Sequence, residues 1–137
     1  MADLVVTVSL VKKVAGSTKT DEGVAGTTIT AGQSLYEDLT DASKLKLADA
    51  DALDTSILKG IALHAALADQ PVEYAWGGLL DVGATVAVGM YYVASTNPGG
   101  IAPYTDLAAG DFPGGIGFGV TAGRIDVRIN NPRVAKA

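Results

Sequence analysis

The feature that most constrains the fold is an internal repeat at an offset of 57 positions. Residues 32–63 align without a gap on residues 89–120, so that glycines, aspartates and apolar residues recur in the same order. The matched positions include Gly32 with Gly89, Leu35 with Tyr92, Asp49 with Asp106, Gly60 with Gly117, and Ile61 with Phe118. Two copies are too few to form a solenoid. We therefore expect a pseudo-duplication with approximate two-fold symmetry inside one domain.

The repeated unit has a β pattern. In residues 89–120, alternating apolar runs flank the turn sequence Ser-Thr-Asn-Pro-Gly-Gly, which is typical of a strand, a tight turn, a short crossing segment and a second strand. Residues 44–48, 58–63 and 124–129 are further short runs with alternating or β-branched residues. We predict an all-β, single-domain antiparallel barrel or sandwich with at most one short helical turn, capped by Asp49 or Asp51.

The alternation also predicts the core. With one face of each short strand turned inward, the side chains expected there are those of Leu35, Leu45, Leu47, Ile61, Leu63, Val93, Ile116, Phe118, Ile125 and Val127.

The two ends of the chain and the segments next to the repeat carry separate expectations. Leu4 to Val14 alternates as a strand with two partly apolar faces, so residues 1–14 are expected to be an arm that adds to a partner's sheet, or else an ordinary edge strand. A barrel domain is expected over residues 15–129, beginning with a mobile loop at 15–23. Gly77-Gly78 predicts a hairpin turn after the strand at 71–76. Residues 130–137 are expected to form a detached tail, because Pro132 excludes a central strand position.

Composition and charge narrow the function classes. The 137 residues include no cysteine and carry a net charge of −5. Residues 1–19 sum to +2, residues 20–81 to −8 and residues 82–137 to +1. This distribution disfavours a nucleic-acid partner and permits contact between oppositely charged surfaces. No apolar run approaches the length of a membrane span, and the N-terminus lacks a signal-peptide pattern.

Candidate chemistry is sparse. His64 is the only histidine and has no recognisable nucleophile motif near it. Asp49, Asp51 and Asp54 resemble the opening of a calcium loop. Such a loop needs an oxygen ligand at its fifth position and glycine at its sixth, where this chain has Leu53 and Asp54. The glycines at 114, 115, 117 and 119 are not followed by a helix that would hold a phosphate. Trp76 is either a core or rim residue, an interface anchor, or a platform for a sugar. We expect no catalytic set, metal or cofactor.

Three stretches carry a family resemblance: LKGIAL at 58–63, GMYYVASTNPGGIAPYTDL at 89–107 and GIGFGVTAGRIDVRI at 115–129. They resemble the head decoration, or cement, proteins of tailed bacteriophages, over roughly residues 32–129. The resemblance implies a β-rich, non-enzymatic protein, made in the bacterial host cytoplasm, that binds the outer surface of a capsid as a homotrimer. It would stabilise contacts between major capsid protein subunits.

From this reading, the residues expected to bind a partner are Leu4, Val6, Val8, Leu10, Lys12, Lys13, Trp76 and Arg133. The alternative is a head-fibre base, or a carbohydrate- or receptor-binding β module of the virion surface, with Trp76 as its platform. An enzyme remains a third class, and neither nucleic acid nor membrane is expected as a partner.

Overall fold

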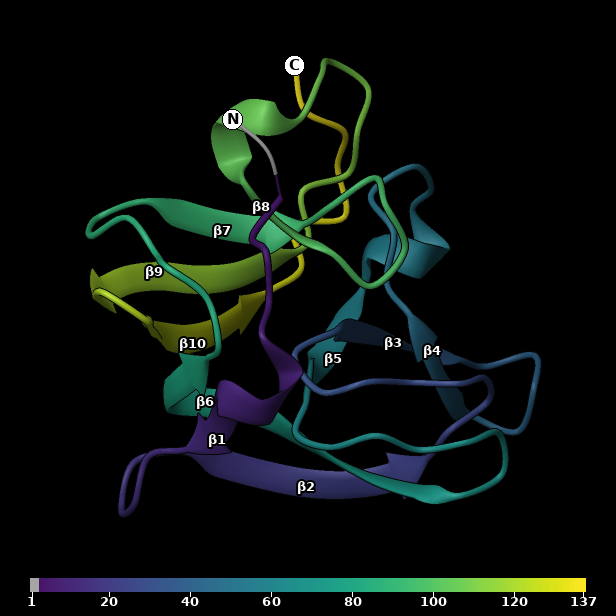
Figure 1. Ribbon diagram of the computed structural model, residues 1–137. Helices are drawn as coiled ribbons and strands as arrows, with labels where there is room; N and C mark the ends of the chain where they lie inside the picture. The colour runs from purple at the N-terminus through teal and green to yellow at the C-terminus, as the bar shows by residue number, and fades with distance from the viewer. Residues whose placement is uncertain (1–2) are drawn as a thin grey trace.

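The computed structural model describes residues 3–137, which form one curled antiparallel sheet of ten strands (Figure 1). Along the main path the strand order is β4-β3-β5-β6-β10-β9-β7-β8, and β1 and β2 both pair with β6. The strands are β1 (Val11–Lys13), β2 (Lys19–Val24), β3 (Ser34–Asp38), β4 (Lys44–Leu47), β5 (Leu58–Ala62), β6 (Pro71–Val82), β7 (Tyr91–Ala94), β8 (Ile101–Pro103), β9 (Gly115–Thr121) and β10 (Arg124–Asn130). The predicted all-β class is confirmed.

The internal repeat is confirmed by the strand pairing. A shift of 57 positions carries β3, β4 and β5 onto β7, β8 and β9. In each triplet the first strand lies in the middle: β3 lies between β4 and β5, and β7 lies between β8 and β9. Leu35 pairs with Gly60 in the first copy, as Tyr92 pairs with Gly117 in the second. Each copy has its register shift at the next position. The two triplets flank the central pair β6 and β10, which gives the sheet its approximate two-fold symmetry.

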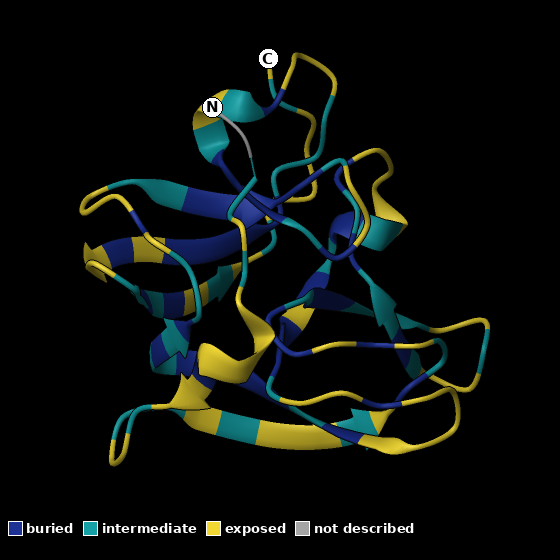
Figure 2. Cartoon of the chain, viewed as in Figure 1, coloured by how far each residue is buried: buried dark blue, intermediate teal, exposed yellow. Residues whose placement is uncertain are grey.

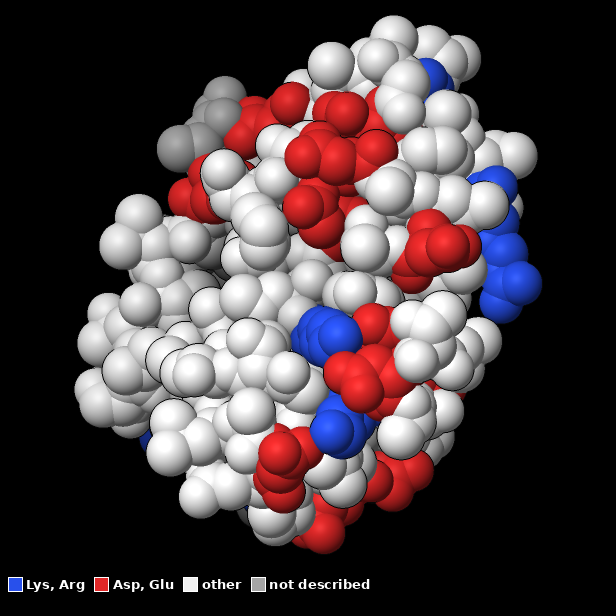
Figure 3. Space-filling model, turned by 90° about the vertical axis from the view of Figure 1, so that its right-hand side faces the viewer, with Lys and Arg blue, Asp and Glu red and all other residues white. Residues whose placement is uncertain are grey.

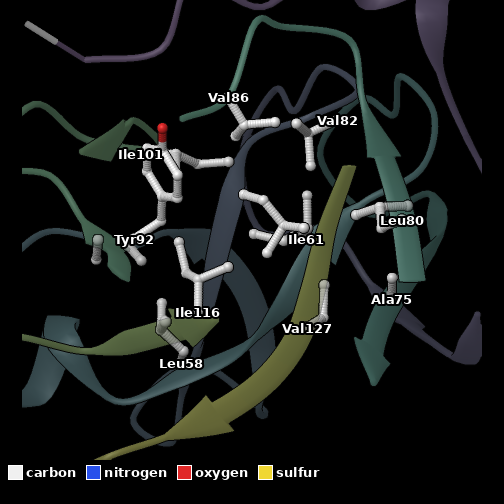
Figure 4. Close-up of a cluster of buried hydrophobic side chains, with 13 residues drawn as sticks. Leu58, Ile61, Ala75, Leu80, Val82, Val86, Tyr92, Ile101, Ile116 and Val127 are labelled. Atoms are coloured by element: carbon white, nitrogen blue, oxygen red, sulfur yellow. The ribbon is translucent and has the colours of Figure 1, made fainter. Parts of the chain in front are cut away.

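Each half of the curled sheet encloses a hydrophobic cluster. The first half surrounds Leu35, Leu45 and Val72 among others, and its two edges approach where Ala25 bridges Leu45. The second half surrounds a larger cluster centred near Ile61, with Leu80, Tyr92, Ile116 and Ile125 among its members (Figure 4). Burial of these aliphatic side chains is the main stabilising contribution that the fold offers.

Most of the predicted core is buried. The side chains of Leu35, Leu45, Ile61, Val93, Ile116, Ile125 and Val127 are all inaccessible or nearly so. Leu47 and Leu63 are partly buried at the edges of the two clusters. The prediction for Phe118 was wrong: its side chain is 49% exposed on the outer face of β9. Strand alternation identifies two faces but does not say which of them is covered.

The N-terminal segment does not form the predicted continuous strand from Leu4 to Val14. Its described part, from residue 3, runs across the second half, makes one 3₁₀ turn, η1 (Val8–Leu10), and becomes a strand only at β1. The Leu4 N–H donates to Ile101 O of β8 at 2.8 Å, and the Thr7 N–H donates to Gly83 O at 2.7 Å. The segment thereby bridges β8 and the end of β6 (Figure 1). Residues 1–2 of the predicted arm lie outside the described residues.

Two expectations for the middle of the chain were wrong. The residues from 19 onward in the predicted loop at 15–23 belong to β2, which pairs along β6 from Gly77 to Pro71. The predicted hairpin turn at Gly77-Gly78 is instead the interior of β6, which continues unbroken for 12 residues. Gly78 is required there because a side chain would overlap Ser17 O. Glycine marks a close backbone approach at this position and not a chain reversal.

The helical turns and the C-terminal tail also differ from prediction. Within residues 3–137 there are three one-turn 3₁₀ helices, η1, η2 (Asp54–Ser56) and η3 (Tyr104–Asp106), where at most one short helical turn was expected. Neither Asp49 nor Asp51 caps η2, because Leu53 holds its N-cap position without a side-chain bond. The C-terminal tail is not detached either. The Lys136 N–H donates to Asp111 O at 2.7 Å, and Lys136 O accepts from the Gly110 N–H at 2.8 Å.

Candidate partner-binding surface

The N-terminal segment is fixed at both ends, so its side chains have defined positions. At its start, the Asp3 carboxylate accepts hydrogen bonds from Ser95 Oγ at 2.8 Å and from Asn97 Nδ2 at 3.0 Å. At its far end, β1 pairs with the last residues of β6, Val11 opposite Val82. The segment is therefore part of the folded surface, in contrast to a free arm.

Side chains of this segment divide between inside and outside. Leu4 packs against the larger cluster. Val6 lies so close over Gly32 that a Cβ added to this glycine would come 2.6 Å from the Val6 Cγ1 methyl. Val5, Val8 and Leu10 are exposed. Figure 2 shows exposed stretches along this N-terminal segment. We call these three side chains the N-terminal ridge. Of the predicted partner-binding residues, Val8 and Leu10 are thus free to contact another molecule, whereas Leu4 and Val6 support the ridge from beneath.

Grooves run along the N-terminal ridge on several sides. One of about 450 Å³ is lined by Val5, Leu10 and Lys12 together with Asp81 and the turn at residues 83–85. Another of about 520 Å³ lies between Val5 and the segment 85–87. A smaller one of about 230 Å³ lies between Val8 and the turn at residues 97–100. Exposed apolar side chains bordered by grooves are typical of a protein-binding surface, because side chains of the partner can enter the grooves.

The predicted cations Lys12 and Lys13 follow the ridge on β1. Both are exposed, and Lys13 Nζ lies 3.4 Å from the Glu73 carboxylate, a contact weak enough to exchange. Among the described residues, β1 has no strand partner except β6. Its other edge therefore offers backbone groups to a strand of another chain.

Trp76 and Arg133 are not part of this surface. Trp76 lies on β6 and is 45% exposed, in a groove that shares no residue with those around the ridge. Arg133 lies on the exposed C-terminal segment, in a left-handed backbone conformation with φ of 61°. The predicted set of eight residues therefore divides into one contiguous surface and two separate positions.

A second apolar surface, on β7 and β9, was not predicted from the sequence. On the outer face of β7 and β9, the Tyr91 ring lies 4.9 Å from the Phe118 ring and 6.0 Å from the Tyr104 ring, centroid to centroid. Val120 follows Phe118 on the same face and is also exposed. The spacing of Phe118 and Val120 is visible in the sequence, but nothing in the sequence distinguishes this face from the covered one.

Acidic side chains spread over much of the face that carries β3 and β4, with basic side chains among them (Figure 3). The best-formed pair joins Lys46 Nζ to Asp38 Oδ2 at 2.7 Å, and Lys44 Nζ similarly meets Asp69 at 2.7 Å. The hydrogen bond from Lys46, followed by those from Thr40, lowers the pKa of Asp38 to about 2. These lysines are engaged by the chain's own acids, so this face presents little unpaired positive charge.

The other candidates for chemistry have local structural roles. His64 Nε2 accepts a hydrogen bond from the Glu73 N–H at 3.0 Å, and its Nδ1 lies 2.9 Å from Ala65 O, so the ring joins two backbone segments. Asp49 Oδ1 accepts from the Asp51 N–H at 2.8 Å within a turn. Over residues 3–137, no three His, Asp or Glu side chains come together in a way that could hold a metal ion. In the same range no helix is long and apolar enough to cross a membrane.

Comparison with protein families and with curated proteins adds no relative. No protein-family model matches the chain, and no curated protein matches it.

Proposed function

We propose that this protein is a structural virion protein that binds the exterior of a phage capsid and stabilises contacts between major capsid protein subunits. The observation that carries the proposal is the N-terminal ridge, where apolar side chains are held in place at the surface of a domain whose core is already closed. Exposed apolar groups that are fixed and bordered by grooves are typical of protein–protein contacts. The resemblance in the repeat supplies the kind of partner.

The ridge and β1 suggest how the contact is made. Val5 and Leu10 would enter apolar hollows on the coat protein, while the unpaired edge of β1 adds to one of its strands. Lys12 and Lys13 border this edge and would meet acidic groups at its rim. The protein would act without catalysis or cofactor, as a homotrimer on the outer surface of the shell.

Sedimentation with capsids tests the proposal. The protein should co-sediment with expanded, mature heads and not with free coat subunits. Leu10→Asp should weaken this binding at least tenfold, because it places a charge in the contact. Leu67→Asp is the matched control, since Leu67 is 60% exposed and Leu10 59% exposed, and Leu67 lines none of the grooves described beside the ridge. Equal loss with both variants, or no binding to heads, would contradict the proposal.

A further inference from the structure

A separate groove, away from the three beside the N-terminal ridge, lies on the outer side of the sheet, where β2, β5, β6 and β10 adjoin. It has a volume of about 670 Å³, which is within the range of small-ligand sites. Its lining includes Trp76, the cations Lys19, Lys59 and Arg128, and one acid, Asp126. In a chain with 15 acidic and 10 basic residues, a groove with three cations and one carboxylate is a local reversal of charge.

The cations of this groove retain unused hydrogen-bond donors. Within the described residues Lys19 has no carboxylate within 4.0 Å, and its ammonium lies 5.5 Å from the centroid of the Trp76 ring. Lys59 lies 3.6 Å from Glu37, a longer contact than those of Lys44 and Lys46. Arg128 bonds Asp126 through Nε alone, at 3.0 Å. An arriving anion would therefore find donors that need not first leave a tight ion pair.

Gly77 lines this groove, and its Cα faces the Lys19 side chain. A Cβ there would meet only the Lys19 side chain, at 3.4 Å or more, which is ordinary contact distance. Because no side chain stands at this position, the methylenes of Lys19 lie across β6 and its ammonium reaches the neighbourhood of Trp76. Gly77 also lies where β2 and β6 change register, since Lys19 is opposite Gly77 and Thr20 is opposite Ala75.

We propose that this groove binds a carboxylated saccharide, such as a uronate or sialate unit of a surface polysaccharide. Trp76 would stack on a sugar ring, and Lys19 and Arg128 would hold the carboxylate. A β-strand peptide is disfavoured, because β6 is paired on both sides here, by β2 and by β10. A nucleic acid is disfavoured by the net charge of −5 and by Asp126 inside the groove.

This activity goes beyond attachment to a capsid. The groove shares no lining residue with those beside the N-terminal ridge, so occupation of one surface does not use the residues of the other. A virion protein that holds the shell through its ridge could present this groove to saccharides of a cell surface. The two activities can therefore be tested separately.

Titration calorimetry with the full-length protein tests the site. The probes are trigalacturonate and α2,8-trisialate, with maltotriose as a neutral trisaccharide of comparable size. At least one acidic probe should bind more tightly than maltotriose, and added salt should weaken its binding. Trp76→Ala should weaken it about tenfold and Lys19→Gln several-fold. Lys44→Gln removes the same charge outside the groove and should change nothing.

Several results would overturn the inference. These are no binding of either acidic probe at millimolar concentration, equal binding of maltotriose, or the same loss with Lys44→Gln as with Lys19→Gln. Stronger binding of hexa-aspartate or oligothymidylate, lost with Lys19→Gln and kept with Trp76→Ala, would show a general anion site instead. Thermal unfolding of each variant establishes that the fold is intact. Since capsid sedimentation does not enter this assay, its outcome is independent of the proposed function.

Discussion

The repeat allows a stability experiment in which the same strand position is tested in two environments. Ile61 and Phe118 are equivalent by the shift of 57 positions, and each pairs with the first residue of its neighbouring strand, Ser34 or Tyr91. Ile61 is fully buried in the larger cluster (Figure 4), whereas Phe118 is half exposed. Replacing each by alanine therefore measures how far burial differs between the two copies.

The expected magnitudes differ clearly. Ile61→Ala removes buried methyl and methylene groups and leaves a cavity, so it should lower the free energy of unfolding by about 2–5 kcal/mol. Phe118→Ala loses the contact with the Tyr91 ring, which is worth about 0.5–1.5 kcal/mol, together with a partial loss of buried ring area. Its total cost should remain near 1–2 kcal/mol and below that of Ile61→Ala.

Urea denaturation followed by tryptophan fluorescence and by circular dichroism measures both costs. With a slope of about 2 kcal/mol per molar urea, Ile61→Ala should lower the midpoint by about 1–2.5 M, and Phe118→Ala by less than about 1 M. Coincident transitions with the two probes justify the two-state treatment. If Phe118→Ala proves the more costly of the two, the outer face of β9 is covered in the protein, and the assignment of inner and outer faces is wrong.

Three further predictions concern single side chains. Gly60→Ala should destabilise by more than about 1 kcal/mol in the same urea assay, because its methyl group would overlap the Ala75 carbonyl oxygen, whereas Gly77→Ala should be nearly neutral. Since bonds from Lys46 and Thr40 lower the pKa of Asp38 to about 2 from 3.8, the stability it contributes is present above about pH 4 and is lost as the pH falls toward 2. Acid titration of Asp38→Asn should therefore show a shallower loss of stability over that interval, and an unchanged slope would refute the pairing. Asp3→Ala should raise amide hydrogen exchange at Leu4 and Thr7 while leaving the strands of the first half unaffected, because it removes the acceptor for Ser95 and Asn97.

The predictions from sequence were correct for the internal repeat. The matched positions of the repeat correctly predicted a duplicated β unit and the all-β class, and both copies have the same strand pairing because each must satisfy the same backbone hydrogen bonds. The predictions failed where a local signal had two structural meanings. Gly77-Gly78 has the composition of a hairpin turn, yet Gly78 makes room for Ser17 O inside a long strand. The polar run from Lys19 resembles a loop, yet its backbone pairs with β6 while its side chains face outward.

The same limit explains the candidate sites. The exposed apolar residues of the N-terminal ridge were predicted in part, since Leu4 to Val14 had more apolar positions than one sheet face could bury. The groove at Trp76 was missed apart from the tryptophan itself. Its cations come from residues 19, 59 and 128, which the sheet brings together only through the pairing of β2, β5 and β10 around β6. No spacing along the chain reveals that arrangement.

The two copies of the repeat differ in how far their equivalent faces are covered. In the first copy, the face carrying Ser34 and Ile61 is covered by the second copy: Ser34 Oγ donates to Gly100 O in the turn between β7 and β8, and Ile61 lies in the cluster that the second half encloses. In the second copy the equivalent residues are Tyr91 and Phe118. Tyr91 packs against a smaller buried cluster of Ala50, Val93 and Leu107, whereas Phe118 is 49% exposed. Aromatic rings at these positions shield part of each other, which limits the cost of exposure. The equivalent faces of the two copies are therefore covered to different extents, and Phe118 and Val120 remain exposed at the surface of the second copy.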